Sequence, residues 1–179
     1  MHVMLDLETL GTSTDALIMS IGAVKFDAAG VHDRFHVGVD IEETMAYGTA
    51  SKPEISAGTV LWWLDNDRWE ARDAWLALDD KVHLSVALDG FSQWYGTDDQ
   101  PVWGNGATFD NVVVKSAYSA CGLRPPWSYK LDRCYRTMVA MYPDVGRLER
   151  VGIHHNAVDD AEYQALQLIK VCAEKGIVL

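Results

Sequence analysis

The sequence predicts an α/β domain with a mixed sheet, and two observations lead to that fold class. Three segments with strand patterns come first, joined by short connections, as in an antiparallel meander. After Pro53, segments with helical spacing alternate with two short strand candidates, so the order becomes β-β-β-α-β-α-β-α. A chain of 179 residues is long enough to form one such domain around a buried core.

The first three strands are expected at residues 2–9, 16–26 and 31–41. The first is apolar with alternation, and the second is nearly continuous in apolar and small residues, as in a strand buried on both faces. A turn at residues 28–30 separates the second strand from the third, whose apolar side chains alternate.

The rest of the chain alternates between helical and strand patterns. Residues 56–75 have helical spacing with a break near residues 65–67, and residues 80–95 form one apolar helical face. The remaining predictions are strands at 101–104 and 129–134, helices at 108–121, 136–142 and 157–175, and a helix-ending glycine at Gly176.

Composition limits the function classes. The net charge of −11 argues against a protein that holds long duplexes through a basic surface. A site that holds only the end of a strand is compatible with this charge, because divalent cations can supply local positive charge. The three widely spaced cysteines indicate reduced thiols, and no secretory signal or apolar run of roughly 18 residues is present. We therefore expect a cytoplasmic protein with no membrane partner.

Asp6 and Glu8 form the first informative motif. Residues i and i+2 of a strand point to the same face, so the two carboxylates lie side by side in an apolar strand. Buried like charges are costly and raise one another's pKa, and a divalent cation removes both penalties. The alternative is that both residues lie at a solvent-exposed face or strand end.

Two later segments add acidic residues. Asp110 follows the glycine-containing turn after the strand at 101–104 and opens a helix; it could instead be only a favourable charge at a helix N-terminus. His155 leads into the last helix and Asp160 lies about one turn inside it, although an exposed capping cluster with Asn156 as cap would look the same. Together these oxygen donors suit Mg²⁺ or Mn²⁺ and not zinc.

The pattern Asp-x-Glu in the first strand, Asp at a middle helix and His-x4-Asp in a late helix resembles the DEDDh subclass of the DnaQ-like exonucleases. The resemblance covers residues 3 to about 172, and the stretches DLETLGT, GNGATFDN and HHNAVDDA are similar to a branch of small bacterial and phage exonucleases that includes mycobacterial-type exoribonucleases. The x4 spacing selects His155 over His154 and Asp160 over Asp159. The resemblance implies an RNase H-like fold, three layers α/β/α with a mixed five-stranded sheet, in a single domain over residues 1–179.

The resemblance also implies an activity. The chain would be a metal-dependent 3′→5′ exonuclease that hydrolyses phosphodiester bonds at the 3′ end of single-stranded or 3′-overhang RNA or DNA and releases nucleoside 5′-monophosphates. Two Mg²⁺ ions, for which Mn²⁺ would substitute, are expected on Asp6, Glu8, Asp110 and Asp160. His155, with an ordinary pKa of about 6.5, is the expected general base. Related enzymes also suggest a homodimer.

Substrate contacts are expected close to these residues. Trp62 and Trp63 are candidates for stacking on a base, although most of the seven tryptophans in the chain must belong to the core. Asn105 either positions the penultimate nucleotide, orients the metal site or is only a turn residue. Arg72 is a further candidate for a phosphate contact. The full set of expected substrate-binding residues is Thr9, Leu10, Gly11, Asn105, Phe109, Trp62, Trp63 and Arg136.

Two other functions share the same expected fold. The first is a catalytically inactive nucleic-acid-binding protein, which the presence of all five expected active-site residues disfavours. The second is an RNase H-like endonuclease that cuts within a duplex, which the His-x4-Asp pair and the acidic composition disfavour.

Overall fold

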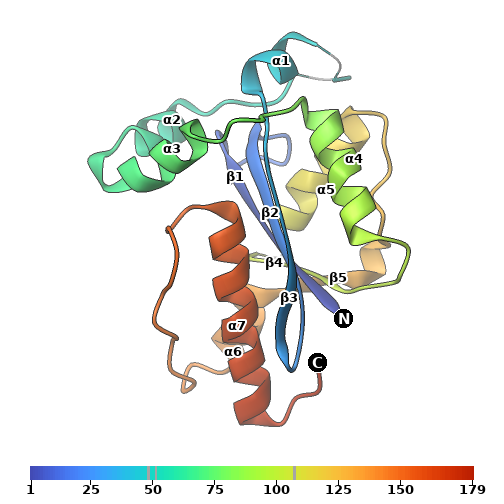
Figure 1. Cartoon of the computed structure of the whole chain (residues 1–179), viewed down its shortest axis with the longest axis vertical. Helices are drawn as coiled ribbons and strands as arrows, with labels where there is room; N and C mark the ends of the chain where they lie inside the picture. The colour runs from blue at the N-terminus through green and yellow to red at the C-terminus, as the bar shows by residue number, and fades with distance from the viewer. Residues whose placement is uncertain (48, 51, 107) are drawn as a thin grey trace.

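A computed structural model describes residues 1–47, 49–50, 52–106 and 108–179 of the chain (Figure 1). Ala107, within the GNGATFDN stretch, lies outside the described residues. The sheet has five strands in the order β3-β2-β1-β4-β5, so the predicted mixed five-stranded sheet is confirmed. Its strands are β1 (His2–Thr9), β2 (Ile18–Asp27), β3 (Gly30–Gly38), β4 (Val102–Gly104) and β5 (Asp132–Cys134).

The first three strands form the predicted antiparallel meander, and β4 and β5 run parallel to β1. Parallel neighbours need a crossover connection, and helices supply it here. The helices are α1 (Ile41–Ala46), α2 (Ala57–Trp63), α3 (Trp69–Leu76), α4 (Leu84–Tyr95), α5 (Asp110–Ala120), α6 (Tyr135–Met141) and α7 (Ala157–Lys175). None of these helices in the described residues is long and apolar enough to cross a membrane.

The helices cover both faces of the sheet, which gives the predicted three layers (Figure 1). Helices α4 and α5 pack on one face, and α6 and α7 pack on the other. The short α2 and α3 lie beyond the carboxyl end of β1 and close a small apolar cluster there.

The third strand and the strand expected at 129–134 differ from the sequence-based predictions. The third strand stops at Gly38, because Asp40 caps α1 by accepting a hydrogen bond from the Glu43 N–H at 2.9 Å. The predicted strand at 129–134 is a 3₁₀ turn (Tyr129–Leu131) followed by the three-residue β5. The break expected near residues 65–67 is confirmed as a 3₁₀ turn (Asn66–Arg68) between α2 and α3.

Alternation along β1 decides which face the acidic pair occupies. Val3, Leu5 and Leu7 point into the cluster beneath α4 and α5. Met4 points the other way, into the cluster beneath α6 and α7. Asp6 and Glu8 have the same parity as Met4, so both carboxylates project from the face that α7 covers.

The start of α7 lies directly on the strand next to that pair. Gly22 of β2 pairs with Asp6, and a Cβ atom at Gly22 would overlap the backbone of Ala157 and Val158. Glycine is required there because the helix backbone touches the sheet backbone. Asn156 caps this helix by accepting from the Asp159 N–H, and Gly176 ends it with φ 65°, both as the sequence predicts.

This contact predicts a large effect of Gly22→Ala. The added methyl group would push the start of α7 away from β2, and overpacking of this kind costs on the order of 1–3 kcal/mol. Urea unfolding measures the change in the free energy of unfolding. Gly90→Ala in α4 is the matched control, because its Cβ atom would meet only Phe35, at 3.8 Å. The control should stabilise the helix by up to about 1 kcal/mol. Equal midpoints for Gly22→Ala and wild type would contradict the contact.

Candidate active site

A cavity of 520 Å³ opens where the carboxyl ends of β1 and β4 meet the first turns of α5 and α7. Crevices at the carboxyl ends of strands are the usual site position in α/β sheets. The residues expected from the sequence that line it are Asp6, Glu8, Thr9, Gly11, Trp62, Trp63, Asn105, Phe109, Asp110, Arg136, His155 and Asp160.

Three of the four expected carboxylates form one close group. Asp6 and Glu8 come from β1 and Asp160 from α7, and each presents an oxygen within 4.8 Å of the other two. All three side chains are buried, with 7%, 9% and 8% of their surface exposed. Oxygen donors gathered in this way are a ligand set for hard divalent cations.

Asp110 joins the site from the first turn of α5. Its Oδ1 atom accepts from the Leu7 N–H at 3.3 Å, and its Oδ2 atom accepts from the Asn105 N–H at 2.7 Å. One carboxylate therefore ties the start of α5 to β1 and to the turn after β4. Asp110 is 2% exposed.

Burial and neighbouring charges raise the pKa values of three of these carboxylates. Burial raises the pKa of Asp6 well above its usual range, and the neighbouring charges of Asp110 and Glu8 raise it further. Burial and the charge of Asp110 raise the pKa of Glu8 to about 8. Burial raises the pKa of Asp110 to about 6, against the lowering effect of the backbone N–H groups of Asn105 and Leu7. This excess of buried negative charge is what a bound divalent cation would neutralise.

Two residues that the sequence analysis missed partly balance this charge. Gln164 donates from Nε2 to Asp6 Oδ1 at 2.7 Å, and Arg150 forms an ion pair with Asp160. Gln164 lies four residues after Asp160, hence on the same helical face, so its spacing could have identified it. Arg150 lies over the ring of Tyr163, 4.9 Å from its centre, and comes from a loop with no sequence pattern that could have revealed it.

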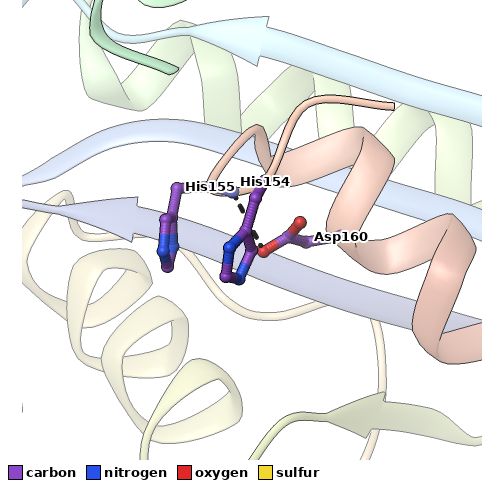
Figure 2. Close-up of side chains that lie close together, drawn as sticks. All are labelled: His154, His155 and Asp160. Atoms are coloured by element: carbon purple, nitrogen blue, oxygen red, sulfur yellow. Dashed lines mark hydrogen bonds between the residues drawn. The ribbon is translucent and has the colours of Figure 1, made fainter. Parts of the chain in front are cut away.

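Both histidines lie beside Asp160 (Figure 2). The two imidazole rings stack with centres 3.8 Å apart, and each ring offers a nitrogen within 4.8 Å of an Asp160 oxygen. The His155 N–H donates to Asp160 Oδ2 at 3.4 Å, and the Trp62 ring meets the His155 ring edge-on at 4.7 Å. The geometry brings both rings to the site, so proximity to Asp160 does not by itself distinguish them.

His155 has an unusual backbone and an unusual pKa. Its φ of 66° makes it the one non-glycine residue in the described part of the chain with a positive φ. Burial, and then the neighbouring charges of His154, Arg68 and Arg150, lower its pKa to about 4. This pKa lies below the ordinary imidazole value of about 6.5. A neutral imidazole at neutral pH can still accept a proton.

Asp159 holds the turn that leads to the histidines. Its Oδ2 atom accepts from the Ile153 N–H at 2.7 Å. A Cβ atom at Gly152, where φ is 86°, would lie 2.7 Å from the Asp159 Cγ atom. The Asp159 carboxylate is thus hydrogen-bonded to the loop backbone, whereas Asp160 belongs to the acidic group.

Trp62 and Trp63 differ in how deeply they are buried. Trp63 is 4% exposed and donates from Nε1 to the Thr9 carbonyl at 2.9 Å, so it is a core residue that supports the cavity wall. Trp62 is 37% exposed and lines the cavity, which leaves it as the candidate for base stacking. Thr9 in turn donates from Oγ1 to the Gly11 carbonyl at 2.7 Å.

Two expected substrate contacts are not brought to the cavity. Leu10 packs in the apolar cluster with Met19 and Trp63, and Arg72 donates to the Trp63 carbonyl at 3.4 Å. Neither is among the cavity's lining residues. The lining adds four residues that the sequence analysis did not single out, Leu7, Thr12, Gly58 and Thr59.

Comparison with solved structures supports the fold. Exonuclease X in complex with 5′-overhanging duplex DNA is 18% identical with a TM-score of 0.60, over 98% of this chain and 93% of that chain. The nuclease domain of 3′hExo, a DEDDh family member bound to rAMP, is 12% identical with a TM-score of 0.64, over 99% and 94%. A zinc-bound complex of E. coli exonuclease I with single-stranded DNA is 17% identical with a TM-score of 0.62, and the match spans 97% of this chain but 40% of that one.

Sequence comparison gives the family. No curated protein sequence matches the chain significantly. The family model described as the Rv2179c-like 3′-5′ exoribonuclease domain matches residues 1–172, nearly the whole chain and all the acidic residues of the site. This confirms the resemblance to the DnaQ-like exonucleases. The chain belongs to the Rv2179c-like family of 3′-5′ exoribonuclease domains and is a 3′-5′ exonuclease.

Proposed function

We propose that this enzyme removes nucleotides from the 3′ end of single-stranded or 3′-overhang nucleic acid and releases nucleoside 5′-monophosphates. The observation that carries the proposal is the group of buried carboxylates from β1, α5 and α7 at one cavity, with two imidazoles beside it. The description of the family favours RNA as the substrate. The rAMP and DNA bound to the structural neighbours support a nucleotide in the corresponding cavity here.

Two divalent cations fit this site, with Mg²⁺ as the first choice and Mn²⁺ as a substitute. The four expected ligands are all carboxylates, and burial leaves the group with more negative charge than Arg150 balances. Asp6 would hold both ions, Glu8 and Asp160 one of them, and Asp110 the other. When bound, such ions supply a lower pKa for the attacking water and positive charge for the leaving oxygen.

The residues of the chain supply the rest of the mechanism. His155, neutral at neutral pH, accepts the proton of the attacking water. Trp62 offers its exposed ring to the terminal base, and the Thr9–Gly11 turn borders the place of the 3′ nucleotide. Arg136, at the far side of the same cavity, neutralises a phosphate.

We further propose a cytoplasmic homodimer. All three cysteines are free, as expected in a reducing compartment. Leu61, Leu64, Trp69 and Leu76 of the α2–α3 region are each more than half exposed, and a second copy would cover them. Light scattering on the intact protein and on Leu61→Asp measures the oligomeric state; a monomeric wild type would rule the dimer out.

The substrate proposal predicts the products from labelled oligonucleotides. With Mg²⁺, a 3′-labelled RNA should release a labelled mononucleotide at once, while a 5′-labelled RNA shortens stepwise. Asp6→Asn should slow hydrolysis by at least about a hundredfold, because a metal contact is worth several kcal/mol of transition-state stabilisation. Cleavage of a circular RNA would instead indicate an endonuclease, and binding without hydrolysis an inactive protein. Matched DNA oligonucleotides give the sugar preference.

The general-base assignment predicts a difference between adjacent histidines. His155→Asn removes the base, but asparagine tolerates the positive φ found at this position. We expect its kcat to fall by about 10²–10⁴-fold. His154→Asn is the matched control and should keep most of the activity. If only His154→Asn is inactive, the roles of the two residues are exchanged.

Protonation of Glu8 predicts how pH affects stability without divalent cations. The pKa of Glu8 is about 8 in the folded chain and 4.5 ordinarily, so between these values the folded state binds more protons than the unfolded state. Stability must then fall as pH rises through this window. From pH 6.5 to 8, above the range where His155 acts in the opposite direction, we expect Tm in EDTA to decrease.

Glu8→Gln is the control for this effect. The variant should show a shallower decrease of Tm over the same range, and Mg²⁺ should raise the wild-type Tm most at pH 8, because carboxylates bind metal when deprotonated. Scanning fluorimetry measures both. Identical pH profiles for wild type and Glu8→Gln would show that Glu8 does not hold a proton in the folded state.

A further inference from the structure

A second cavity of 350 Å³ adjoins the active-site cavity, and Arg136 lines both. We call it the α6 groove, because α6 and the loop that follows form it. Its volume is within the range of roughly 300–1,000 Å³ that is usual for ligand clefts. The lining residues that matter here are Arg136, Val139, Tyr142, Pro143, Val145 and Arg147.

The α6 groove lies in a basic stretch of an acidic chain. Residues 124–150 contain six arginines and lysines and three carboxylates, although the whole chain has a net charge of −11. The acidic residue nearest in sequence to the groove, Asp144, is paired with Lys175, whose ammonium also lies 5.8 Å from the centre of the Tyr142 ring. Arg136 and Arg147 are both exposed, so their charge is available to an anion.

Arg147 is held in place from several directions. Its Nη1 atom donates to the Tyr135 hydroxyl at 3.2 Å. Gln167 of α7, which is completely buried, binds the residues on both sides of it: Oε1 accepts from the Leu148 N–H at 2.8 Å, and Nε2 donates to the Gly146 carbonyl at 3.3 Å. A buried amide that fixes an exposed arginine reduces the entropy that a ligand must remove on binding.

The groove is continuous with the place of the reacting nucleotide. A Cβ atom at Gly106 would lie 3.9 Å from the guanidinium carbon of Arg136, so this guanidinium sits on the turn that also carries Asn105 of the active-site cavity. A strand whose 3′ nucleotide occupies the active-site cavity can therefore pass over Arg136 into the groove. Tyr142 and Pro143 line the groove together with the buried Val139 and Val145, so aromatic and apolar side chains are available there to a base.

We propose that the α6 groove is a binding subsite for an upstream nucleotide of the single-stranded substrate, the first that the active-site cavity does not hold. Arg136 and Arg147 bind successive backbone phosphates, and Tyr142 stacks on the base. This inference rests on the proposed function. It gives an acidic enzyme a short positive path for a polyanion without a basic surface elsewhere.

The test compares RNA oligonucleotides of two to six nucleotides with the intact protein and Mg²⁺. For the wild type we expect KM to fall with length until the groove is filled. Arg147→Ala and Tyr142→Ala should each raise KM of the longer oligonucleotides, by about tenfold for the loss of a stacked base, and so flatten the dependence on length. Arg147→Lys, which keeps the charge, should recover part of the effect and also serves if Arg147→Ala folds poorly.

Arg133→Ala is the matched control. Arg133 is an exposed arginine of the same basic stretch, but it donates to the Lys130 carbonyl at 2.9 Å and is not part of the groove. It should keep the wild-type dependence on length. The subsite is wrong if Arg147→Ala and Arg133→Ala raise KM equally, or if neither Arg147→Ala nor Tyr142→Ala changes it.

Failure of the proposed function would be seen separately. If the wild type does not hydrolyse the oligonucleotides, they remain intact, and calorimetry with the same variants measures Kd across the same lengths. A Kd that decreases with length in the wild type but not in Arg147→Ala supports the subsite even then, and a Kd independent of length in both overturns it.

Discussion

The contact between the start of α7 and the backbone of Gly22 determines the geometry of the site. It sets Asp160 and the two histidines, from the end of the chain, beside Asp6 and Glu8 from its beginning. Two backbones can touch in this way only where the strand has no side chain. The acidic group therefore exists because one position in the neighbouring strand is glycine, and because alternation along β1 turns both carboxylates toward that helix.

The same arrangement places carboxylates together in a way that is unfavourable in itself. Burial and then neighbouring charge raise the pKa values of Asp6 and Glu8, and Gln164, Arg150 and the backbone N–H groups that bind Asp110 offset the negative charge in part. A protein interior tolerates such a group when the rest of the fold over-determines it, and here β1 lies at the centre of the sheet between two apolar clusters. The stability of the sheet thus maintains a site whose affinity for cations comes from its own unfavourable charge.

Much of this could be predicted from the sequence because it depends on short-range patterns. Alternation in β1, the spacing of His155 and Asp160, and the cap at Asn156 are local and correctly indicate the elements and most of the acidic group. Arg150 could not be found, because an irregular loop has no period that places its side chains. The pKa of His155 and the burial of Trp63 could not be predicted from the sequence either, because both depend on which residues pack around them.

The distribution of charge explains how an acidic exonuclease can handle a polyanion. A basic surface would bind strands along their whole length and compete with the 3′ end for the enzyme. In this chain residues 124–150 carry six of the fifteen basic residues against three carboxylates, and Arg136 and Arg147 of the α6 groove belong to this stretch. Arg136 belongs to both cavities, so the phosphate it binds would fix the strand relative to the carboxylates. Attraction would then be confined to the few nucleotides that lie near the cations of the acidic group and near the two arginines of the groove. Electrostatic repulsion between the strand and the remaining acidic surface would favour release of each shortened strand.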